Sequence, residues 1–427
     1  MDMHQTHCRP APSARVACGR FALPWLLALL ILGSGCASDG RWASPQVSEV
    51  ASDSFAVTWS ADLPLSGSLL EQLHINENLL FAYDSQNVGY FISRDSGHLR
   101  VIKELDRPIA RIFPPVTVED RIVIPTSNHL MIFDRQGNFA HEVFMRFGIA
   151  SGGAGFGEYV YVGLATFLAR QDQATQGGRL VAMPTYPQPY DTGPRWEVAV
   201  PQSYITAAPV IYERQLFAAA RDGGVFSVRP GTPPQAGWPL LQRGIFQTQG
   251  PVLADLKADE DGLYVASADT RLYCIDRDTG RLRWVYYSTQ PLEHASTPIP
   301  LADSVYIYVP RVGVAAITKA GEGTVRAPRW VVSEAVQFLA SDDSNIYLRT
   351  ADNHIIGVDK VDGRVKMRSQ RGDLRVFATN TTTRDGMIYA GTQRGRVLAI
   401  RPVLKPGTFG EYVLGVPATA EAVAAAR

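Results

Sequence analysis

The sequence predicts an all-β fold: an eight-bladed β-propeller with four-stranded antiparallel blades. Three observations support this prediction. A short three-strand motif occurs in the chain, it repeats at a period near 40 residues, and a tryptophan recurs at the end of the repeat. One such motif cannot bury its apolar face alone, so the copies must pack against one another.

The motif is clearest between residues 263 and 284. Residues 263–266 and 271–275 are two short runs rich in apolar and aromatic side chains, and a third run follows at 281–286. Small polar turns separate the runs, and Gly280 ends the second turn, where a positive φ costs least. This pattern predicts an antiparallel meander of three strands.

About eight copies of the motif follow one another. Their equivalent positions are Phe81, Val123, Tyr161, Phe217, Tyr264, Tyr306, Tyr347 and Tyr389. Successive members are 42, 38, 56, 47, 42, 41 and 42 residues apart. A strand-only repeat of about 40 residues is typical of a propeller with one blade per repeat. The longest separation predicts an insertion in the third repeat.

The two ends of the predicted domain, residues 54–403, complement each other. Residues 55–61 read as a strand with no repeat of their own, and the last repeat, 388–402, lacks a final tryptophan-bearing strand. We therefore expect the N-terminal strand to complete the last blade, which closes the ring and removes its open edge.

Tryptophans follow the turn at the end of five strand repeats. They are Trp59, Trp196, Trp238, Trp284 and Trp330. A large, flat side chain buries roughly 150–250 Å², so we expect these residues to dock adjacent blades, together with the turn residues Asp276 and Gly280. Val101, Met367 and His141 take the tryptophan position in other repeats. The alternative for the tryptophans is a stacking platform for a sugar or a quinone.

The first 35 residues predict an export signal and not part of the fold. Three arginines precede an apolar run of 12 residues, 21–32, which is too short to span a bilayer. The run ends in small residues before Cys36 and there resembles a bacterial lipoprotein signal. In that family the cysteine is lipidated, although Gly33 stands where leucine is usual. Ordinary secretory cleavage is the alternative.

Residues 36–53 lack periodicity and predict a flexible tether, and 404–427 form a C-terminal tail. The resemblance to lipoproteins implies an outer-membrane lipoprotein that faces the periplasm, because Ala37 follows the cysteine. Without residues 1–35 the chain carries 38 basic and 40 acidic residues, a net charge of −2. This balance gives no support for nucleic-acid binding. Cys274 is then the one cysteine left besides Cys36, which excludes a disulfide framework, and we expect Cys274 in the core.

Residues 274–284 carry a family resemblance. The pattern Ala-x-Asp-x-x-Thr-Gly-x-x-x-Trp of propellers of the pyrroloquinoline-quinone (PQQ) type stands here with Cys274 in place of alanine, and fragments recur at Asp359, Gly363 and Ala399. The resemblance covers roughly residues 54–403 and implies the eight-bladed fold. With its lipoprotein signal, the chain is also similar to the BamB family of outer-membrane assembly lipoproteins. That similarity implies a non-catalytic scaffold without cofactor, monomeric within a complex, which binds envelope proteins such as β-barrel assembly components.

The rival interpretation is a PQQ-dependent dehydrogenase or a related propeller that binds a small molecule. Those enzymes are longer, hold PQQ and Ca²⁺ on the propeller axis, and often carry adjacent cysteines, which are missing here. The densest acidic cluster, 259–261, precedes a strand and predicts a solvated hairpin loop. We expect no catalytic residues and no metal site, although a propeller site assembles from distant loops and the alternative stays open.

The third repeat supplies the candidate partner-binding loop. The insertion 164–178 carries Phe167, Leu168 and Arg170, and the segment 184–190 carries Tyr186 and Tyr190. Tyrosine, phenylalanine and arginine are favoured in interface cores. The alternative is a plain surface insertion.

Overall fold

The computed structural model describes residues 54–170, 173–186, 193–200, 203–231, 233–238, 244–370 and 372–403, with two short strands at 412–413 and 416–417. The predicted signal 1–35, the lipid anchor Cys36, the tether 36–53 and most of the tail lie outside these residues. In the described part of the chain, no helix has the length and apolar character that a membrane span requires.

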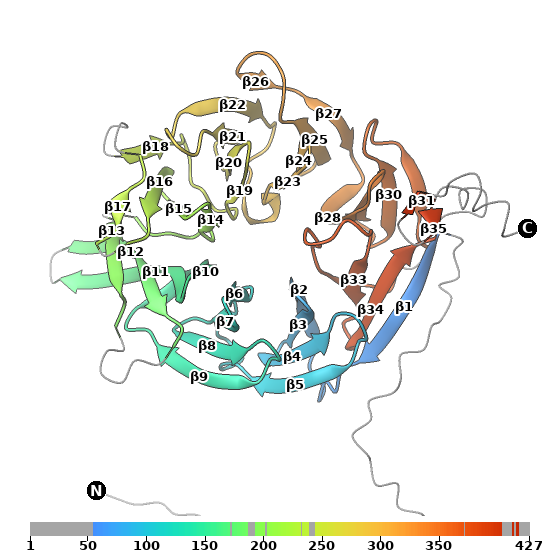
Figure 1. Cartoon of the computed structure of the whole chain (residues 1–427), viewed down its shortest axis with the longest axis horizontal. Coiled ribbons are helices and arrows are strands. Elements are labelled where there is room, and N and C mark those ends of the chain that lie inside the picture. The colour runs from blue at the N-terminus through green and yellow to red at the C-terminus, as the bar shows by residue number, and fades with distance from the viewer. Residues whose placement is uncertain are drawn as a thin grey trace, which may run out of the picture. The chain divides into compact units, whose positions relative to one another are not determined.

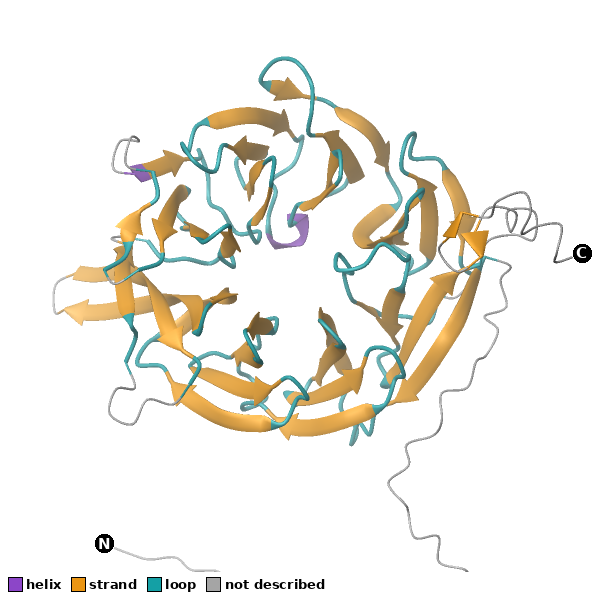
Figure 2. Cartoon of the chain, viewed as in Figure 1, coloured by secondary structure: helices purple, strands orange, loops and turns teal. Residues whose placement is uncertain are grey.

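Eight antiparallel sheets stand around a central axis, as predicted (Figures 1 and 2). Blades 1 to 4 consist of β2 (Leu70–Asn76), β3 (Leu79–Asp84), β4 (Val88–Ser93) and β5 (Leu99–Glu104); β6 (Val116–Val118), β7 (Arg121–Pro125), β8 (His129–Asp134) and β9 (Phe139–Phe144); β10 (Gly148–Phe156), β11 (Tyr159–Arg170), β12 (Gln173–Pro184) and β13 (Trp196–Val200); and β14 (Val210–Tyr212), β15 (Gln215–Ala219), β16 (Gly224–Arg229), β17 (Gln235–Ala236) and β18 (Ile245–Gln247).

Blades 5 to 8 complete the ring. They consist of β19 (Lys257–Asp259), β20 (Gly262–Ser267), β21 (Arg271–Ile275), β22 (Leu282–Tyr287) and β26 (Val325–Arg326); β23 (Ile299–Leu301), β24 (Ser304–Val309), β25 (Gly313–Thr318) and β27 (Pro328–Val332); β28 (Ala335–Ser341), β29 (Asn345–Thr350), β30 (Ile355–Asp359) and β31 (Val365–Arg368); and β32 (Val376–Phe377), β33 (Ile388–Gly391), β34 (Arg396–Pro402) and β1 (Phe55–Asp62). A 3-10 turn (His294–Ser296) leads into blade 6, and β35 (Tyr412–Val413) pairs with β36 (Val416–Pro417) outside the ring.

The N-terminal strand completes the last blade, as the sequence predicts. Strand β1 pairs antiparallel with β34 from Phe55↔Pro402 to Asp62↔Arg396, and the sheet order is β1-β34-β33-β32. The two strands lie at opposite ends of the colour scale in Figure 1 and run side by side. The first and last blades are therefore joined by a backbone hydrogen-bond ladder.

The hydrophobic core lies between the blades. Among the described residues it divides into eight clusters, and each cluster draws its side chains mainly from two adjacent blades. Blade 8 packs on blade 1 in the same way, through Trp59, Tyr389 and Tyr90. Burial of apolar area at every seam is what makes the blades mutually dependent.

The antiparallel order defines two faces of the ring. We call face A the side that carries the turns between the second and third strands and the connections to the next blade. Face B carries the other two turns of each blade. Two blades depart from the simple pattern: β17 and β18 both pair with β16 in blade 4, and β26 adds to β22 in parallel in blade 5.

Candidate functional site

The predicted docking tryptophans lie in the seams, where each of the five is at most 9% exposed. Within its blade each ring packs on an aromatic ring of the second strand, with centroids 5.5–6.1 Å apart. These contacts are the ones that a blade-docking role requires.

The indole also binds the following blade through the turn after its third strand. Trp59 Nε1 donates to the carbonyl oxygen of Arg94 at 3.0 Å, and Trp330 Nε1 donates to that of Lys360 at 2.9 Å. A Cβ added to Gly97 would lie 2.5 Å from Trp59 Cε3, and one on Gly363 would lie 2.7 Å from Trp330 Cγ. Both glycines also have a φ above +70°. The turn therefore needs glycine because the ring lies directly on it.

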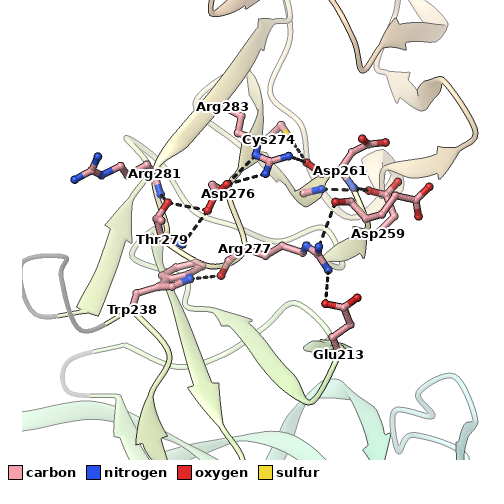
Figure 3. A network of polar contacts seen from close by, with 12 residues as sticks. Glu213, Trp238, Asp259, Asp261, Cys274, Asp276, Arg277, Thr279, Arg281 and Arg283 are labelled. Carbon is pink, nitrogen blue, oxygen red and sulfur yellow. Dashed lines mark hydrogen bonds and ion pairs between the residues drawn. The ribbon is translucent and has the colours of Figure 1, made fainter.

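The turn of blade 5 shows how the repeat motif builds this receptor (Figure 3). Trp238 Nε1 donates to the Arg277 carbonyl oxygen, and Asp276 accepts from the backbone and hydroxyl of Thr279 at 2.9 and 2.8 Å. Asp276 also pairs with Arg283 at 2.7 Å. Burial opposes ionisation of Asp276, but these hydrogen bonds outweigh it and lower its pKa to about 2. Asp276 and Gly280 thus shape the turn, and the carbonyl between them receives the tryptophan.

A basic residue that sequence reasoning missed follows the third strand in most repeats. Arg94, Arg277 and Lys319 each reach back to the preceding blade: Arg277 pairs with Glu213 at 3.5 Å, and Lys319 pairs with Asp259 and Asp261. The signal was available, because a lysine or arginine precedes the turn glycine by two to four residues in these repeats. The acidic cluster 259–261 is therefore partly engaged in a seam and is not only a solvated loop.

Arg94 is buried and lies across the closing seam. Its guanidinium donates to the hydroxyls of Tyr389 at 3.0 Å, Thr382 at 2.9 Å and Thr383 at 3.0 Å, and to the carbonyl of Glu77. Arg94 is 9% exposed. Three of these acceptors are hydroxyl oxygens of blade 8, so the side chain locks the last blade to the first.

A phenylalanine replaces the tryptophan in the seam between blades 1 and 2. Val101 takes the tryptophan position opposite Phe91, whereas Trp284 lies opposite Cys274. The Phe91 ring lies against Gly137 of the next turn and 4.8 Å from the Phe133 centroid. The large ring has moved from the fourth strand to the third. Cys274 is free and fully buried, as expected, and burial raises the pKa of its thiol to about 12.

Two connected cavities of about 600 and 650 Å³ lie along the axis of the ring. They share the lining residues Gln72, His74, Pro114, Asp255 and His294. His74 packs against the rings of Phe81 and Tyr83, with both ring centroids 6.3 Å from that of His74. Burial lowers the pKa of His74 to about 4, so the imidazole is neutral near pH 7. The channel can accept a small molecule by size.

The donors along the axis do not fit a calcium-dependent quinone site. Calcium takes six to eight oxygen ligands. Glu71 and Asp255 are the carboxylates that line the two described cavities, and Asp255 already accepts from the backbone of Ala208 at 2.8 Å. Across the described residues no group of three histidine, cysteine or acidic side chains could hold a metal ion.

Of the predicted partner-binding residues, those whose backbone the structure describes lie near opposite ends of the β11–β12 hairpin of blade 3. The prediction that the insertion is a loop is wrong. The insertion is a hairpin in which β11 and β12 pair up to Arg170↔Gln173, and it extends outward from the ring (Figure 1). Phe167, Leu168 and Arg170 belong to β11, but their side chains lie outside the description.

Tyr186 lies at the opposite end of β12, about 36 Å of strand away from the hairpin tip. Its hydroxyl donates to Asp120 of blade 2, and the Arg121 guanidinium lies 4.9 Å from its ring centre. Tyr186 therefore belongs to an inter-blade contact on face B. Tyr190 lies outside the described residues.

Comparisons with known proteins agree with this architecture. Residues 248–403 match a family model of PQQ-type repeats described as outer membrane protein assembly factor BamB. The chain is similar to the crystal structure of BamB from Moraxella catarrhalis, with 16% identity and a TM-score of 0.56 over 82% of this chain and 98% of that one. It is also similar to the computationally designed Ika8 protein, with 14% identity and a TM-score of 0.58 over 80% and 98%. Comparison with curated proteins gave no match. The chain is therefore similar to BamB in its β-propeller fold, and it matches PQQ-type repeats over residues 248–403.

Proposed function

We propose that the chain is a non-catalytic, lipid-anchored scaffold that binds other envelope proteins, with a BamB-like role in outer-membrane protein assembly. The observation that carries the proposal is the match of residues 248–403 to the model described as outer membrane protein assembly factor BamB, within a ring of BamB-like fold. The anchor would be Cys36 and the place the periplasmic side of the outer membrane, on the evidence of the signal sequence.

The contacts of the charged side chains support a role in binding and not in catalysis. The described ion pairs of Arg277, Lys319 and Asp276 stabilise seams and turns. The axial cavity holds few carboxylates, and a neutral histidine packed against two aromatic rings is poorly placed to move protons at pH 7. A rigid ring with its polar groups used internally leaves loops and edges for partners.

Affinity purification of the full-length chain from crosslinked envelopes tests the proposal. We expect defined envelope proteins, β-barrel assembly components among them, at near-stoichiometric yield. A Cys36→Ser variant should lose membrane association and keep its fold. Recovery of the chain alone from crosslinked envelopes would contradict the scaffold role.

The hairpin of blade 3 can be tested within the same experiment. Residues 167–176 would be replaced by Asn-Gly, because Thr166 pairs with Gly177 and this dipeptide closes a two-residue hairpin. The shortened hairpin keeps the blade intact. Loss of a partner would assign it to the hairpin, whereas full recovery would mark the hairpin as a plain extension.

The axial cavities favour a second candidate, binding of a small molecule such as a quinone. Each cavity has the volume of a typical ligand pocket. Titration of the purified chain with PQQ, with and without Ca²⁺, and followed by tryptophan fluorescence, checks this candidate. Saturable binding together with dye-linked alcohol or sugar oxidation would favour an enzyme over a scaffold.

A further inference from the structure

The connection between blades 1 and 2 presents an isoleucine to solvent on face A. Ile109 is 94% exposed, more than any other large apolar side chain among the described residues. It stands in the turn between β5 and β6, and the neighbouring Pro108 and Ala110 line the mouth of the axial cavity. A single exposed isoleucine is common on protein surfaces. The residues around Ile109 therefore decide whether it belongs to a binding surface.

The turn that carries Ile109 is held rigidly. The Asn87 side chain donates to the carbonyl oxygens of Arg107 at 2.6 Å and Ala110 at 2.8 Å, and the Ala110 backbone donates to Arg107 at 2.8 Å. Asp106 accepts from the Arg107 backbone at 2.7 Å and from the Thr126 hydroxyl at 2.7 Å. A pre-organised turn loses little conformational entropy when a partner binds.

Two exposed arginines flank this isoleucine. Neither Arg107 nor Arg111 has an ion pair with any described residue. The Arg111 guanidinium lies 4.6 Å from the centre of the Phe113 ring, which orients it. Glu71 lines the same cavity mouth as Arg111. The turn thus offers two cations around one apolar side chain.

A second apolar side chain extends the surface. Phe144 is 67% exposed, and its ring lies 4.2 Å from that of His129. His129 Nδ1 lies 3.6 Å from Asp106, which belongs to the turn itself. We call Arg107, Ile109, Arg111 and Phe144 the blade 1–2 patch. Arginine and aromatic residues around an apolar centre are the composition of interface hot spots.

We propose that the blade 1–2 patch docks an acidic segment of a partner protein, with Ile109 as its apolar anchor. Arg107 and Arg111 pair with carboxylates on either side of the pocket that receives the isoleucine. Arg111 lines the axial cavity, and the other members of the patch lie in the connection between blades 1 and 2 and at the end of β9. This inference rests on the proposed scaffold function and specifies the chemistry of one partner.

Site-specific photocrosslinking in intact envelopes tests the patch. The full chain would carry p-benzoylphenylalanine in place of Ile109 or, as a matched control, in place of Val361, which is 70% exposed in a face-B turn. We expect a protein adduct at position 109 and not at 361, and mass spectrometry should map it to an acidic segment of the partner.

Charge reversal supplies the second arm. Arg107→Glu with Arg111→Glu should lower the crosslink yield about tenfold, as loss of a hot spot would, and added salt should lower it further. Arg364→Glu, on face B with its side chain 80% exposed, is the control and should change nothing. Melting temperatures of all variants identify any that fail to fold.

The outcomes separate the two proposals. Equal adducts at 109 and 361, an adduct to a basic segment, to lipid or to a second copy of this chain, or a yield unaffected by charge reversal would each overturn the patch. If the full chain still recovers envelope partners in those cases, the scaffold function stands. If no partner is recovered by either method, both proposals fail.

Discussion

At the residue scale, five of the seams depend on a tryptophan ring and on the turn of the next blade that it covers. The pattern of tryptophans predicted the ring, but the acceptor carbonyl and the basic residue beside it were not predicted. Both the acceptor carbonyl and the basic residue belong to a neighbouring blade. The sequence of a single repeat does not show which residues of the neighbouring blade its tryptophan contacts. The exchange of tryptophan for phenylalanine between Val101 and Phe91 escaped prediction for the same reason, because cross-strand register decides it.

Truncation of one docking ring should cost much of the stability. Trp330→Ala removes a side chain that is 7% exposed and leaves Gly363 facing a void. We expect a loss of about 3–5 kcal/mol in the free energy of unfolding, measured by guanidinium denaturation. Val361→Ala, in the turn that the indole covers but exposed, should stay within about 0.5 kcal/mol of the wild type; equal losses would show that the seam contributes nothing special.

Arg94 should matter more than an ordinary surface arginine. Arg94→Ala removes the donors for three hydroxyls of blade 8 and one carbonyl of its own blade. We expect a loss of at least about 2 kcal/mol, because buried acceptors are left unpaired. The same denaturation experiment on Arg364→Ala, whose side chain is 80% exposed, is the control. A melting curve for Arg94→Ala equal to that of the control would refute its role at the closing seam.

Asp276 gives a prediction for pH. Its pKa is lowered from 3.8 to about 2 in the folded chain, so its contribution to stability is present above pH 4 and is lost as the pH falls toward 2. Asp276→Asn should be less stable than the wild type at pH 7 by at most about 2 kcal/mol. The difference between the two proteins should shrink at pH 3 and below. A constant difference across this range would show that the carboxylate charge is irrelevant.

At the scale of the element, strand periodicity predicted the meander well. The runs expected at 263–266, 271–275 and 281–286 are β20, β21 and β22 within one residue or so at most ends. The third repeat was harder, because an insertion of 15 residues has no partner in the other repeats to be compared with. Gln, Ala, Thr and Gly in it suggested a loop, yet pairing with an existing strand made it a hairpin.

The N-terminal strand is the element on which closure depends. Deletion of residues 54–61 would expose the edge of β34 and remove Trp59 from the seam with blade 1. We expect a broadened or early thermal transition, and aggregation through the open edge. Removal of residues 412–417, which pair only with each other in the described part of the chain, is the control. A cooperative transition equal to that of the intact chain would contradict the role of β1.

At the scale of the whole molecule, the ring is a set of eight similar seams, and its rigidity as a scaffold requires all eight. Closure was predictable because the repeat array has one extra strand at its N-terminal end and lacks one strand at its C-terminal end. The exposed surfaces of the ring could not be predicted from the sequence. The exposure of a side chain depends on how connections such as 106–111 fold beside the axis. A propeller closed by its first strand should behave as one cooperative unit.

Hydrogen–deuterium exchange of the unmodified chain tests this closure most directly. The amides of β1 that bond to β34 should exchange as slowly as those of the central strands of blades 1 and 8, and with the same dependence on denaturant. Fast exchange of residues 55–62 beside protected central strands would show an open ring, and the account of a rigid closed scaffold would be wrong.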